Sequence, residues 1–265
     1  QAVADSVLRA TIESEEDIIG GCLALMEVKT GAITALANCH RLDNAEIGEY
    51  YNYAISHSYE PGEVAQTMTL AAALSDGIVK SLEEKIPTNH GRLTDTPAFR
   101  DHYIIQYERK NQADSISVID GFALSYRYVT SSLALKYAQS QDYFYKWYET
   151  FCINDYNFDL DEMRELDLVD PIGRDINTLT SAGSGYGFTV CPMQILTFYN
   201  TIANNGEMMR PMLIKKMESE KLGSQYMHPR KLNEMVFRTE VADSLKKALA
   251  KCTESGTTRI LSGMQ

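Results

Sequence analysis

Helical spacing of apolar residues recurs in several segments of the chain. We predict helices over 3–14, 117–138, 141–151 and 238–256, the last ended by Gly256. In 141–151 the aromatic residues share one stripe, which is more typical of a packed core than of a stacking platform. The stripe consists of Tyr143, Phe144, Trp147, Tyr148 and Phe151.

Two apolar runs, 22–28 and 32–38, are bounded by the short turn Lys29-Thr30-Gly31. Runs joined by a short turn that contains glycine are typical of a β-hairpin. The string K-T-G is therefore interpreted here as a hairpin turn rather than as a catalytic element. A further strand is predicted over 209–217.

Pro61-Gly62 introduces a helix over 64–74 whose small and apolar residues lie on most faces, which predicts a buried central helix. The three glycines of 183–187 lack the dinucleotide-binding spacing and predict a turn. The helix that follows is expected to start at Pro192 and to stop at Asn205-Gly206.

The remaining segments are polar. Charge and composition limit the partners that the chain is expected to bind. Residues 80–116 are expected to be rich in loops, and 154–180 to be acidic and irregular. The net charge of −11 and the lack of a basic cluster with interleaved aromatic residues exclude nucleic acid as an expected partner. No run approaches the roughly 20 apolar residues of a membrane span, so any membrane anchor is expected outside this chain.

Cysteine and histidine spacing predicts neither a metal site nor a cofactor. The five cysteines form no C-x-x-C pair, and the five histidines form no H-E-x-x-H motif. We expect the thiols to be small buried apolar groups. Whether Cys22 and Cys39 pair is left open.

Several ordered blocks of the chain together resemble one known family. They are MEVKTGAITALAN, YNYAISHSYEPG, GSGYGFTVCPMQILTFYNTIANNGEMMRP and ESGTTRILSG, with the helix from Val64 between the second and third. This set resembles the transpeptidase domain of class B penicillin-binding proteins. The resemblance implies a single α/β (α+β) domain over 1–265, with a sheet flanked by helices, an all-helical lobe and a cleft between them.

In that family a serine at the start of the central helix attacks the D-Ala-D-Ala carbonyl of a peptidoglycan stem peptide. A lysine three residues later takes its proton, because positions i and i+3 of a helix face the same way. The resemblance places these two roles at Glu63 and Gln66. A carboxylate is a poor acyl acceptor and an amide has no basic nitrogen, so the nucleophilic unit is predicted to be lost.

The family's second element, S-x-N, corresponds to Ser125-Tyr126-Arg127. Arginine offers only hydrogen-bond donors and a fixed charge where the family has asparagine. We hypothesise an ion pair between Arg127 and Glu63, against the alternative of a solvated Arg127. The resemblance also makes Ser125, Arg127, Gly185 and Tyr186 candidates for binding substrate.

The family's third element, a strand bearing K-T-G, would follow Gln265, and we expect missing polypeptide there. Ser244 and Lys247 satisfy S-x-x-K literally, yet they lie on an amphipathic helix with other lysines and are predicted to face solvent. Thr67 and Thr69 have no lysine three residues on. Glu63 has two possible roles: it could act as a general base, or its negative charge could stabilise the N-terminus of the helix. We favour the second role.

The function expected from these residues is a catalytically inactive transpeptidase-like domain that binds or scaffolds at the cell envelope. The alternative is an active D,D-transpeptidase or carboxypeptidase whose site residues are engineered or misaligned. A pure structural module is a third class. The resemblance implies the bacterial periplasm or the outer face of the inner membrane, and it implies stem peptide or other cell-wall synthesis proteins as partners.

Overall fold

The computed structural model describes residues 1–88, 114–151, 157–158, 161–162, 176–221 and 223–263. By its internal contacts the chain divides into two compact units. Unit 1 comprises 1–59, 151–167 and 190–236, and unit 2 comprises 60–150, 168–189 and 237–265. Each unit is described by itself, and the assignment of 1–265 to a single domain stays a prediction.

The sheet of unit 1 has three antiparallel strands in the order β1-β2-β3. β1 (Gly20–Met26) pairs with β2 (Ile33–Arg41), from Gly20 opposite His40 to Met26 opposite Ile33, and β3 (Ile47–Gly48) pairs with the end of β2. The predicted hairpin is thus confirmed, with Lys29-Thr30-Gly31 in its turn. Gly31 has a φ of +73°, which favours glycine.

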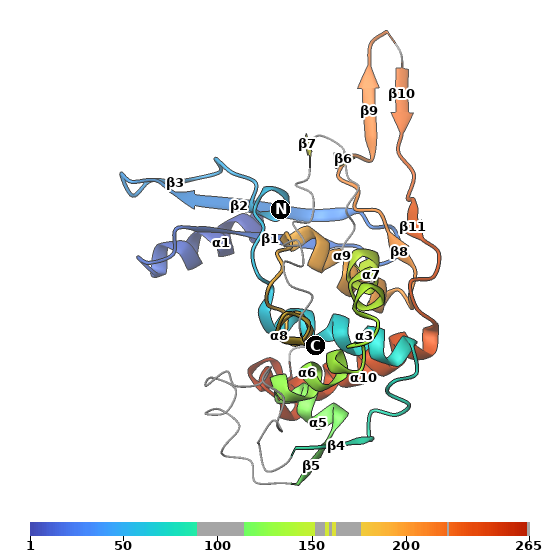
Figure 1. The fold of residues 1–265 in the computed structure, drawn as a ribbon. Helices are drawn as coiled ribbons and strands as arrows, with labels where there is room; N and C mark the ends of the chain where they lie inside the picture. Colours follow the sequence, from blue (N-terminus) through green and yellow to red (C-terminus); the bar gives the residue numbers. More distant parts are fainter. Residues whose placement is uncertain (89–113, 152–156, 159–160, 163–175, 222, 264–265) are drawn as a thin grey trace. The chain divides into compact units, whose positions relative to one another are not determined.

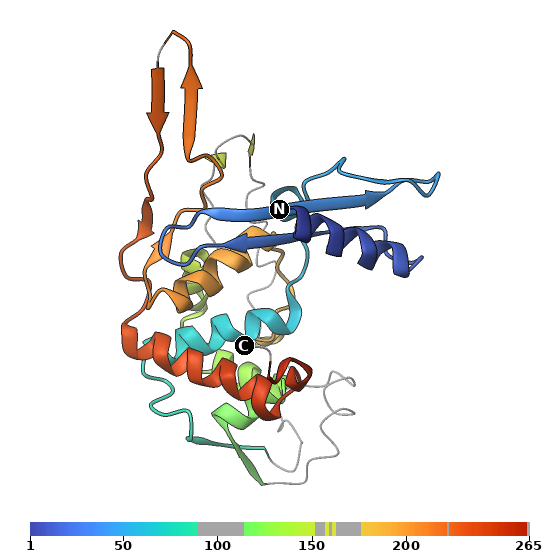
Figure 2. The ribbon, with the colours of Figure 1, turned by 180° about the vertical axis from the view of Figure 1, so that it is seen from behind.

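Helices cover both faces of this sheet, as predicted (Figures 1 and 2). α1 (Ala2–Ser14) packs on one face, where Ala4 forms a cluster with Ala35 and Ala37. α2 (Tyr53–Ser56) and α9 (Pro192–Ala203) pack on the other face. The alternation of side chains along β1 explains the two clusters, since Leu23 lies in the first and its neighbours Cys22 and Ala24 lie in the second.

The four cysteines in the described part of the chain are free thiols. Cys22 and Cys191 belong to the cluster between the sheet and α9, and burial raises the pKa of Cys22 to about 11. Burial raises the pKa of the Cys191 thiol as well, so both thiols are protonated at neutral pH and pack as small apolar groups, as predicted. Cys39 does not pair with Cys22, and Cys152 lies outside the described residues.

The predicted strand over 209–217 is wrong, because this segment is two short strands with a break between them. β8 (Met208–Met209) pairs with β11 (Lys231–Asn233), and β9 (Lys216–Ser219) pairs with β10 (Gly223–Tyr226). Pro211 lacks an N–H, and Met212 instead exchanges backbone hydrogen bonds of 2.9 Å with Gly31 and Ile33. Unit 1 also holds the strand pair β6 (Asn157–Phe158) and β7 (Asp161–Glu162).

Unit 2 is mainly helical and is built around α3 (Gln66–Ser75), which follows the 3₁₀ turn η1 (Gly62–Ala65). α3 packs beside α6 and α10, and Figures 1 and 2 show α3 and α10 side by side. The other helices are α5 (Val118–Ala123), α6 (Arg127–Leu135), α7 (Gln141–Phe151), α8 (Ile176–Gly183), α10 (Thr239–Ser255) and η4 (Arg259–Leu261). β4 (Lys85–Pro87) and β5 (Ser115–Ser117) form a small two-stranded sheet.

The prediction of a buried central helix is confirmed, because every residue from Gln66 to Ala73 is buried. The hydroxyl of Thr69 donates to Gly183 O at 2.8 Å and contacts the Tyr148 hydroxyl at the same distance. At the end of α3, Asp76 accepts hydrogen bonds of 2.6 to 2.9 Å from Tyr137, Tyr143 and Trp147. These contacts hold the helix in place from its middle to its end.

Three sequence predictions for unit 2 need correction. The predicted helix over 117–138 is broken between α5 and α6, where Ser125 has a φ of +54°. The predicted irregular stretch 154–180 and turn from 180 include α8, which packs on α6. In the aromatic stripe, Phe144 and Tyr148 are buried, but Tyr143 is exposed and reaches Asp76 with its hydroxyl.

The other boundaries agree with the sequence analysis. α9 begins at Pro192 and stops before Asn205 and Gly206, both in the left-handed region, and Gly256 is the C-cap of α10. No helix in the described part of the chain is both long enough and apolar enough to cross a bilayer. Most of the predicted loop-rich stretch 80–116, and most of 154–180, lie outside the described residues.

Candidate active site at the start of the central helix

Two backbone segments of unit 2 meet at the start of η1. Gly62 N donates to Gly185 O at 2.9 Å, and Gly187 N donates to the Glu60 carboxylate at 2.7 Å. Gly185 has a φ of +91°, and a Cβ there would lie 1.8 Å from Gly62 O. Only glycine allows this close approach, which fixes Tyr186 beside the start of the central helix.

Tyr186 is the partner of Arg127. The Arg127 guanidinium carbon lies 4.4 Å from the centre of the Tyr186 ring, and the guanidinium also donates a hydrogen bond to the Tyr186 hydroxyl. Tyr186 in turn lies next to Gly62, since its hydroxyl is 3.5 Å from an ideal Cβ built there. A cation over an aromatic face is stabilised by the ring quadrupole, so Arg127 is held at this place.

The structure does not show the ion pair that we hypothesised between Arg127 and Glu63. Among the described residues, Arg127 contacts Tyr186, and no carboxylate oxygen lies within 4.0 Å of its guanidinium. Tyr186 was predicted as a substrate-binding residue by itself, and its pairing with Arg127 had no signal in the local sequence. Residues 127 and 186 meet only because α6 and the loop after α8 fold together.

Ser125 lies in the bend between α5 and α6, two residues before Arg127. Its hydroxyl contacts the Thr257 hydroxyl at 3.4 Å, and Thr257 N donates to Ala123 O at 3.0 Å. A Cβ at Gly256 would lie 2.1 Å from Ala123 O, so only glycine lets this stretch approach the bend. The block ESGTTRILSG thus joins the bend, and Thr257 is a neighbour that the sequence analysis missed.

Glu63 and Gln66 occupy the first turn of the central helix. Glu63 lies in η1 and is exposed, and no hydrogen bond or ion pair engages its carboxylate among the described residues. Gln66 is the first residue of α3 and is 1% exposed, and its buried Nε2 has no hydrogen-bond partner among the described residues. Side chains three apart in such a turn point the same way, so the carboxylate and the amide lie on one side of it.

The groups that the structure places at the start of the central helix and in the bend are a carboxylate, an amide, a guanidinium and hydroxyls. The hydroxyl nearest the bend, that of Ser125, contacts another hydroxyl rather than an amine or an imidazole. Gln66 provides an amide, which has no proton-accepting nitrogen. Among the described residues, the site holds a positive charge on an aromatic face and a buried amide whose nitrogen has no hydrogen-bond partner.

The other candidate residues lie elsewhere and have structural partners. Ser244 donates to Glu240 O at 2.8 Å, and Lys247 pairs with Glu83 at 2.6 Å, so both are occupied on the exposed side of α10. In the hairpin turn, Lys29 donates to Asn204 at 3.0 Å and Thr30 donates to Glu27. The interpretation of this K-T-G as a structural turn is consistent with these contacts.

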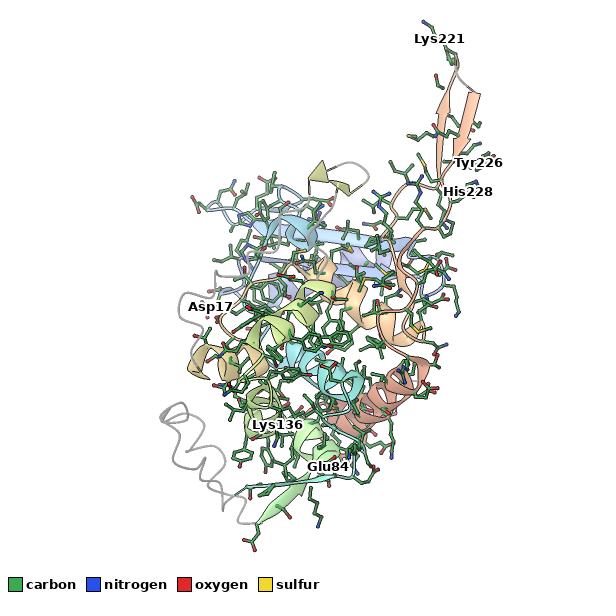
Figure 3. All side chains as sticks on the ribbon, turned by 45° about the vertical axis from the view of Figure 1, so that its right-hand side comes forward. Asp17, Glu84, Lys136, Lys221, Tyr226 and His228 are labelled. Carbon is green, nitrogen blue, oxygen red and sulfur yellow. The ribbon has the colours of Figure 1, made fainter. Side chains whose placement is uncertain are left out.

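A cavity of about 530 Å³ in unit 2 is lined by β4, the first residue of α5, and α6. Its lining includes Glu84 and Lys136, which Figure 3 labels, but none of the residues that we assigned to the site. Among the described residues, no group of three or more histidine, cysteine, aspartate or glutamate side chains could hold a metal ion.

The penicillin binding protein transpeptidase domain family matches residues 21–264. The chain belongs to this family. The match spans most of both units and includes all six candidate site residues. The resemblance found in the sequence is thereby confirmed at the level of family and fold, whereas the assignment of individual site positions stays a prediction. A search of curated protein sequences found no match.

Solved transpeptidase structures share the fold at low sequence identity. The transpeptidase domain of Burkholderia pseudomallei penicillin-binding protein 3 aligns with a TM-score of 0.75 and 17% identity, over 98% of this chain and 70% of that one. Streptococcus pneumoniae penicillin-binding protein 2B, strain R6, gives 0.80 and 16%, over 98% and 46%.

A third solved structure is that of M. tuberculosis penicillin-binding protein A as a ceftriaxone acyl-enzyme complex. It aligns with a TM-score of 0.72 and 19% identity, over 88% of this chain and 56% of that one. The chain thus spans about half the length of the S. pneumoniae and M. tuberculosis structures. At these identities the likeness establishes the fold, and the activity of this chain has to be argued from its own residues.

Proposed function

We propose that this transpeptidase-family domain does not form an acyl-enzyme and acts instead by binding at the bacterial cell envelope. The proposed place is the periplasm or the outer face of the inner membrane, where the family's peptidoglycan chemistry takes place. The proposed partners are the stem peptide, bound without turnover, or other cell-wall synthesis proteins.

The state of Gln66 carries this proposal. A lysine there would place an amine beside the residue at 63, but the buried Gln66 amide cannot accept a proton. A glutamate at 63 could give only a mixed anhydride on attack, which hydrolyses readily. Both halves of a nucleophile and base pair are therefore absent, and losses of this kind typically remove several orders of magnitude of rate.

Arg127 supports the same conclusion from a second element. Its guanidinium lies on the Tyr186 ring, at the position that the resemblance assigns to an amide-holding asparagine. A fixed positive charge there favours a carboxylate or another anion over a neutral peptide amide. We infer that a ligand of this site would bind through a negatively charged group.

Labelling with a fluorescent penicillin tests the proposal. We expect no covalent adduct on this protein under conditions that fully label an active penicillin-binding protein in the same tube. Intact-mass measurement after incubation with ceftriaxone gives the same answer without a fluorophore. An adduct on any side chain of the site would overturn the proposal in favour of an active transpeptidase or carboxypeptidase.

The double variant Glu63→Ser and Gln66→Lys is the complementary experiment. Acylation of this variant, but of neither single variant, would show that these two residues by themselves account for the loss. Ser244→Ala with Lys247→Ala is the matched control, since it changes a literal S-x-x-K on an exposed helix face. We expect this control to leave penicillin reactivity unchanged.

A further inference from the structure

The β9–β10 hairpin of unit 1 is bare on both of its faces. All eight residues of its two strands are exposed, including Met217 at 42% and Tyr226 at 60%. Met217 stands opposite Gln225 and Tyr226 opposite Lys216, so each face carries one exposed large side chain. A two-stranded hairpin is at best marginally stable by itself, and no third strand pairs with this one among the described residues.

The alternation of backbone hydrogen bonds along the β9–β10 hairpin shows which N–H and C=O groups point away from the partner strand. Met227 N donates inward to Lys215 O at 2.9 Å. Inward and outward backbone groups alternate along an antiparallel strand, so Ser224 and Tyr226 direct their N–H and C=O to the outer edge of β10. By the same alternation, Lys216 and Glu218 direct their N–H and C=O groups to the outer edge of β9.

The two outer edges differ in protection. On β9, Lys216 and Glu218 form an ion pair with each other, and charged side chains on an edge strand oppose the addition of a further strand. β10 has the sequence Gly-Ser-Gln-Tyr and carries no charge. Within the part of the chain that the structure describes, the outer edge of β10 is therefore the more favourable of the two for pairing with a further strand.

The surroundings of this edge are cationic, although the whole chain has a net charge of −11. Residues 210–231 contain six lysines and arginines against two glutamates. Beyond the end of β10 a cavity of about 190 Å³ is lined by two arginines, a histidine and two methionines: Arg210, Met212, Met227, His228 and Arg230. Figure 3 shows Lys221, Tyr226 and His228 along this arm, from its tip towards its base.

We propose that an acidic, extended segment of a partner protein adds as a third strand along the outer edge of β10. Its backbone pairs with Ser224 and Tyr226, and a carboxylate side chain enters the cavity between Arg210 and Arg230. The inference rests on the binding role proposed above and names a partner surface for it. None of these residues belongs to the site in unit 2.

A peptide strand fits this surface better than a polyanion or a lipid headgroup does. Backbone N–H and C=O groups at an edge are satisfied by another backbone, which supplies affinity in strand addition. Methionine side chains adapt their shape to apolar partners, and two of them line the cavity beside the cationic groups. A partner that alternates acidic and apolar residues would match both features.

The test uses a fluorescein-labelled peptide of alternating glutamate and valine, ten residues long, and the whole chain described here. We expect saturable binding by fluorescence anisotropy that weakens as salt rises. Arg230→Glu should weaken it by about tenfold or more, the effect of losing one well-placed charge contact. Lys80→Glu, which makes the same charge change at an exposed lysine of unit 2, is the matched control and should leave affinity within about twofold.

Proline variants test the edge itself. Tyr226→Pro removes an outward N–H of β10 without removing a donor to β9, and it should weaken binding by about tenfold or more. Glu218→Pro removes an outward N–H of β9, and it should leave affinity unchanged or improve it. Hydrogen exchange should show the Ser224 and Tyr226 amides protected when the peptide binds.

Several results would overturn this inference. They are the absence of binding, equal binding to the Tyr226→Pro variant, and binding without protection of the β10 amides. Equal or stronger binding of dextran sulfate, or of phosphatidylglycerol vesicles, with the same sensitivity to Arg230→Glu, would show a general anion surface instead. Penicillin labelling is a separate readout, so failure of the proposed function and failure of this surface are distinguishable.

Discussion

The β1–β2 and β9–β10 hairpins of unit 1 are packed in opposite ways. The β1–β2 hairpin is covered by α1 on one face and by α2 and α9 on the other, and its side chains form two apolar clusters. The β9–β10 hairpin has no cover on either face among the described residues. The same local motif thus serves as core in one place and as exposed surface in another, and surroundings rather than strand pairing decide which.

The largest expected difference between the hairpins comes from burying a charge. Ala37→Asp places a carboxylate where Ala37 is 1% exposed beneath α1, and we expect a loss of about 3 kcal/mol or more of unfolding free energy. Gln225→Asp at an exposed position of β10 should change it by less than about 0.5 kcal/mol. Urea unfolding of both variants measures the difference, and equal losses would contradict the comparison.

A matched pair of glycines, one in each hairpin, sharpens the comparison between the β1–β2 and β9–β10 hairpins. Gly31 and Gly223 have φ values of +73° and +74°, but a Cβ at Gly31 would lie 2.3 Å from Arg210 O, whereas nothing lies within 4 Å at Gly223. Both alanine variants bear the left-handed strain of about 1–2 kcal/mol. Only Gly31→Ala adds a backbone clash, which we expect to cost a further roughly 1–3 kcal/mol in urea unfolding. A larger loss at Gly223 would show that the bare hairpin is more tightly packed than its exposure indicates.

Truncating the exposed side chains should have a smaller effect. The double variant Met217→Ser and Tyr226→Ser removes the large exposed groups of both faces and should leave the unfolding free energy within about 0.5 kcal/mol. The measurement is the urea midpoint at constant slope. A loss above about 2 kcal/mol would mean that these side chains are buried against the protein itself.

The smallest expected effect is electrostatic and lies at the base of the bare hairpin. Lys231 donates to Glu207 at 2.9 Å, which lowers the pKa of Glu207 and raises the pKa of Lys231. The Glu207 contribution is present above the ordinary glutamate pKa and is lost as pH falls through the lowered value. The Lys231 contribution is present below the ordinary lysine pKa and is lost as pH rises through the raised one.

The pair therefore favours the folded state between these limits, and only slightly because both groups are exposed. The stability difference between the parent protein and Glu207→Gln should be largest near neutral pH and should vanish in acid. Thermal unfolding across pH checks this. A difference that grows in acid would contradict the sign.

Much of the fold was predictable because its signals are local. Two apolar runs around Lys29-Thr30-Gly31 predicted the first hairpin, and Pro192 and Gly256 predicted where two helices begin and end. These residues restrict the backbone directly, through a missing N–H or a missing Cβ, so their effect needs no distant partner. The order of the sequence blocks that resemble the transpeptidase family also indicated the fold.

The errors arose where distant contacts override local pattern. Residues 209–217 have strand-like composition, but the backbone of Met212 pairs with the turn of the first hairpin instead. The bend at Ser125 interrupts a stretch of continuous helical spacing, although Leu124, Ser125 and Tyr126 are neither glycine nor proline. Tyr126 N donates to Gly121 O across the bend at 2.8 Å. α8 was missed because the acidic residues before it obscured its short apolar pattern.

The sequence by itself determined which chemical groups the candidate site has: an acid and an amide at 63 and 66, and a guanidinium at 127. No folding can give those atoms a nucleophilic alcohol or a basic amine. Only the tertiary structure decided that Arg127 lies on Tyr186. It also decided, within the described part of the chain, that Gln66 is buried with no hydrogen-bond partner for its Nε2, and that the β1–β2 hairpin is covered while the β9–β10 hairpin is not. These are contacts between residues far apart in the chain, and local spacing carries no information about them.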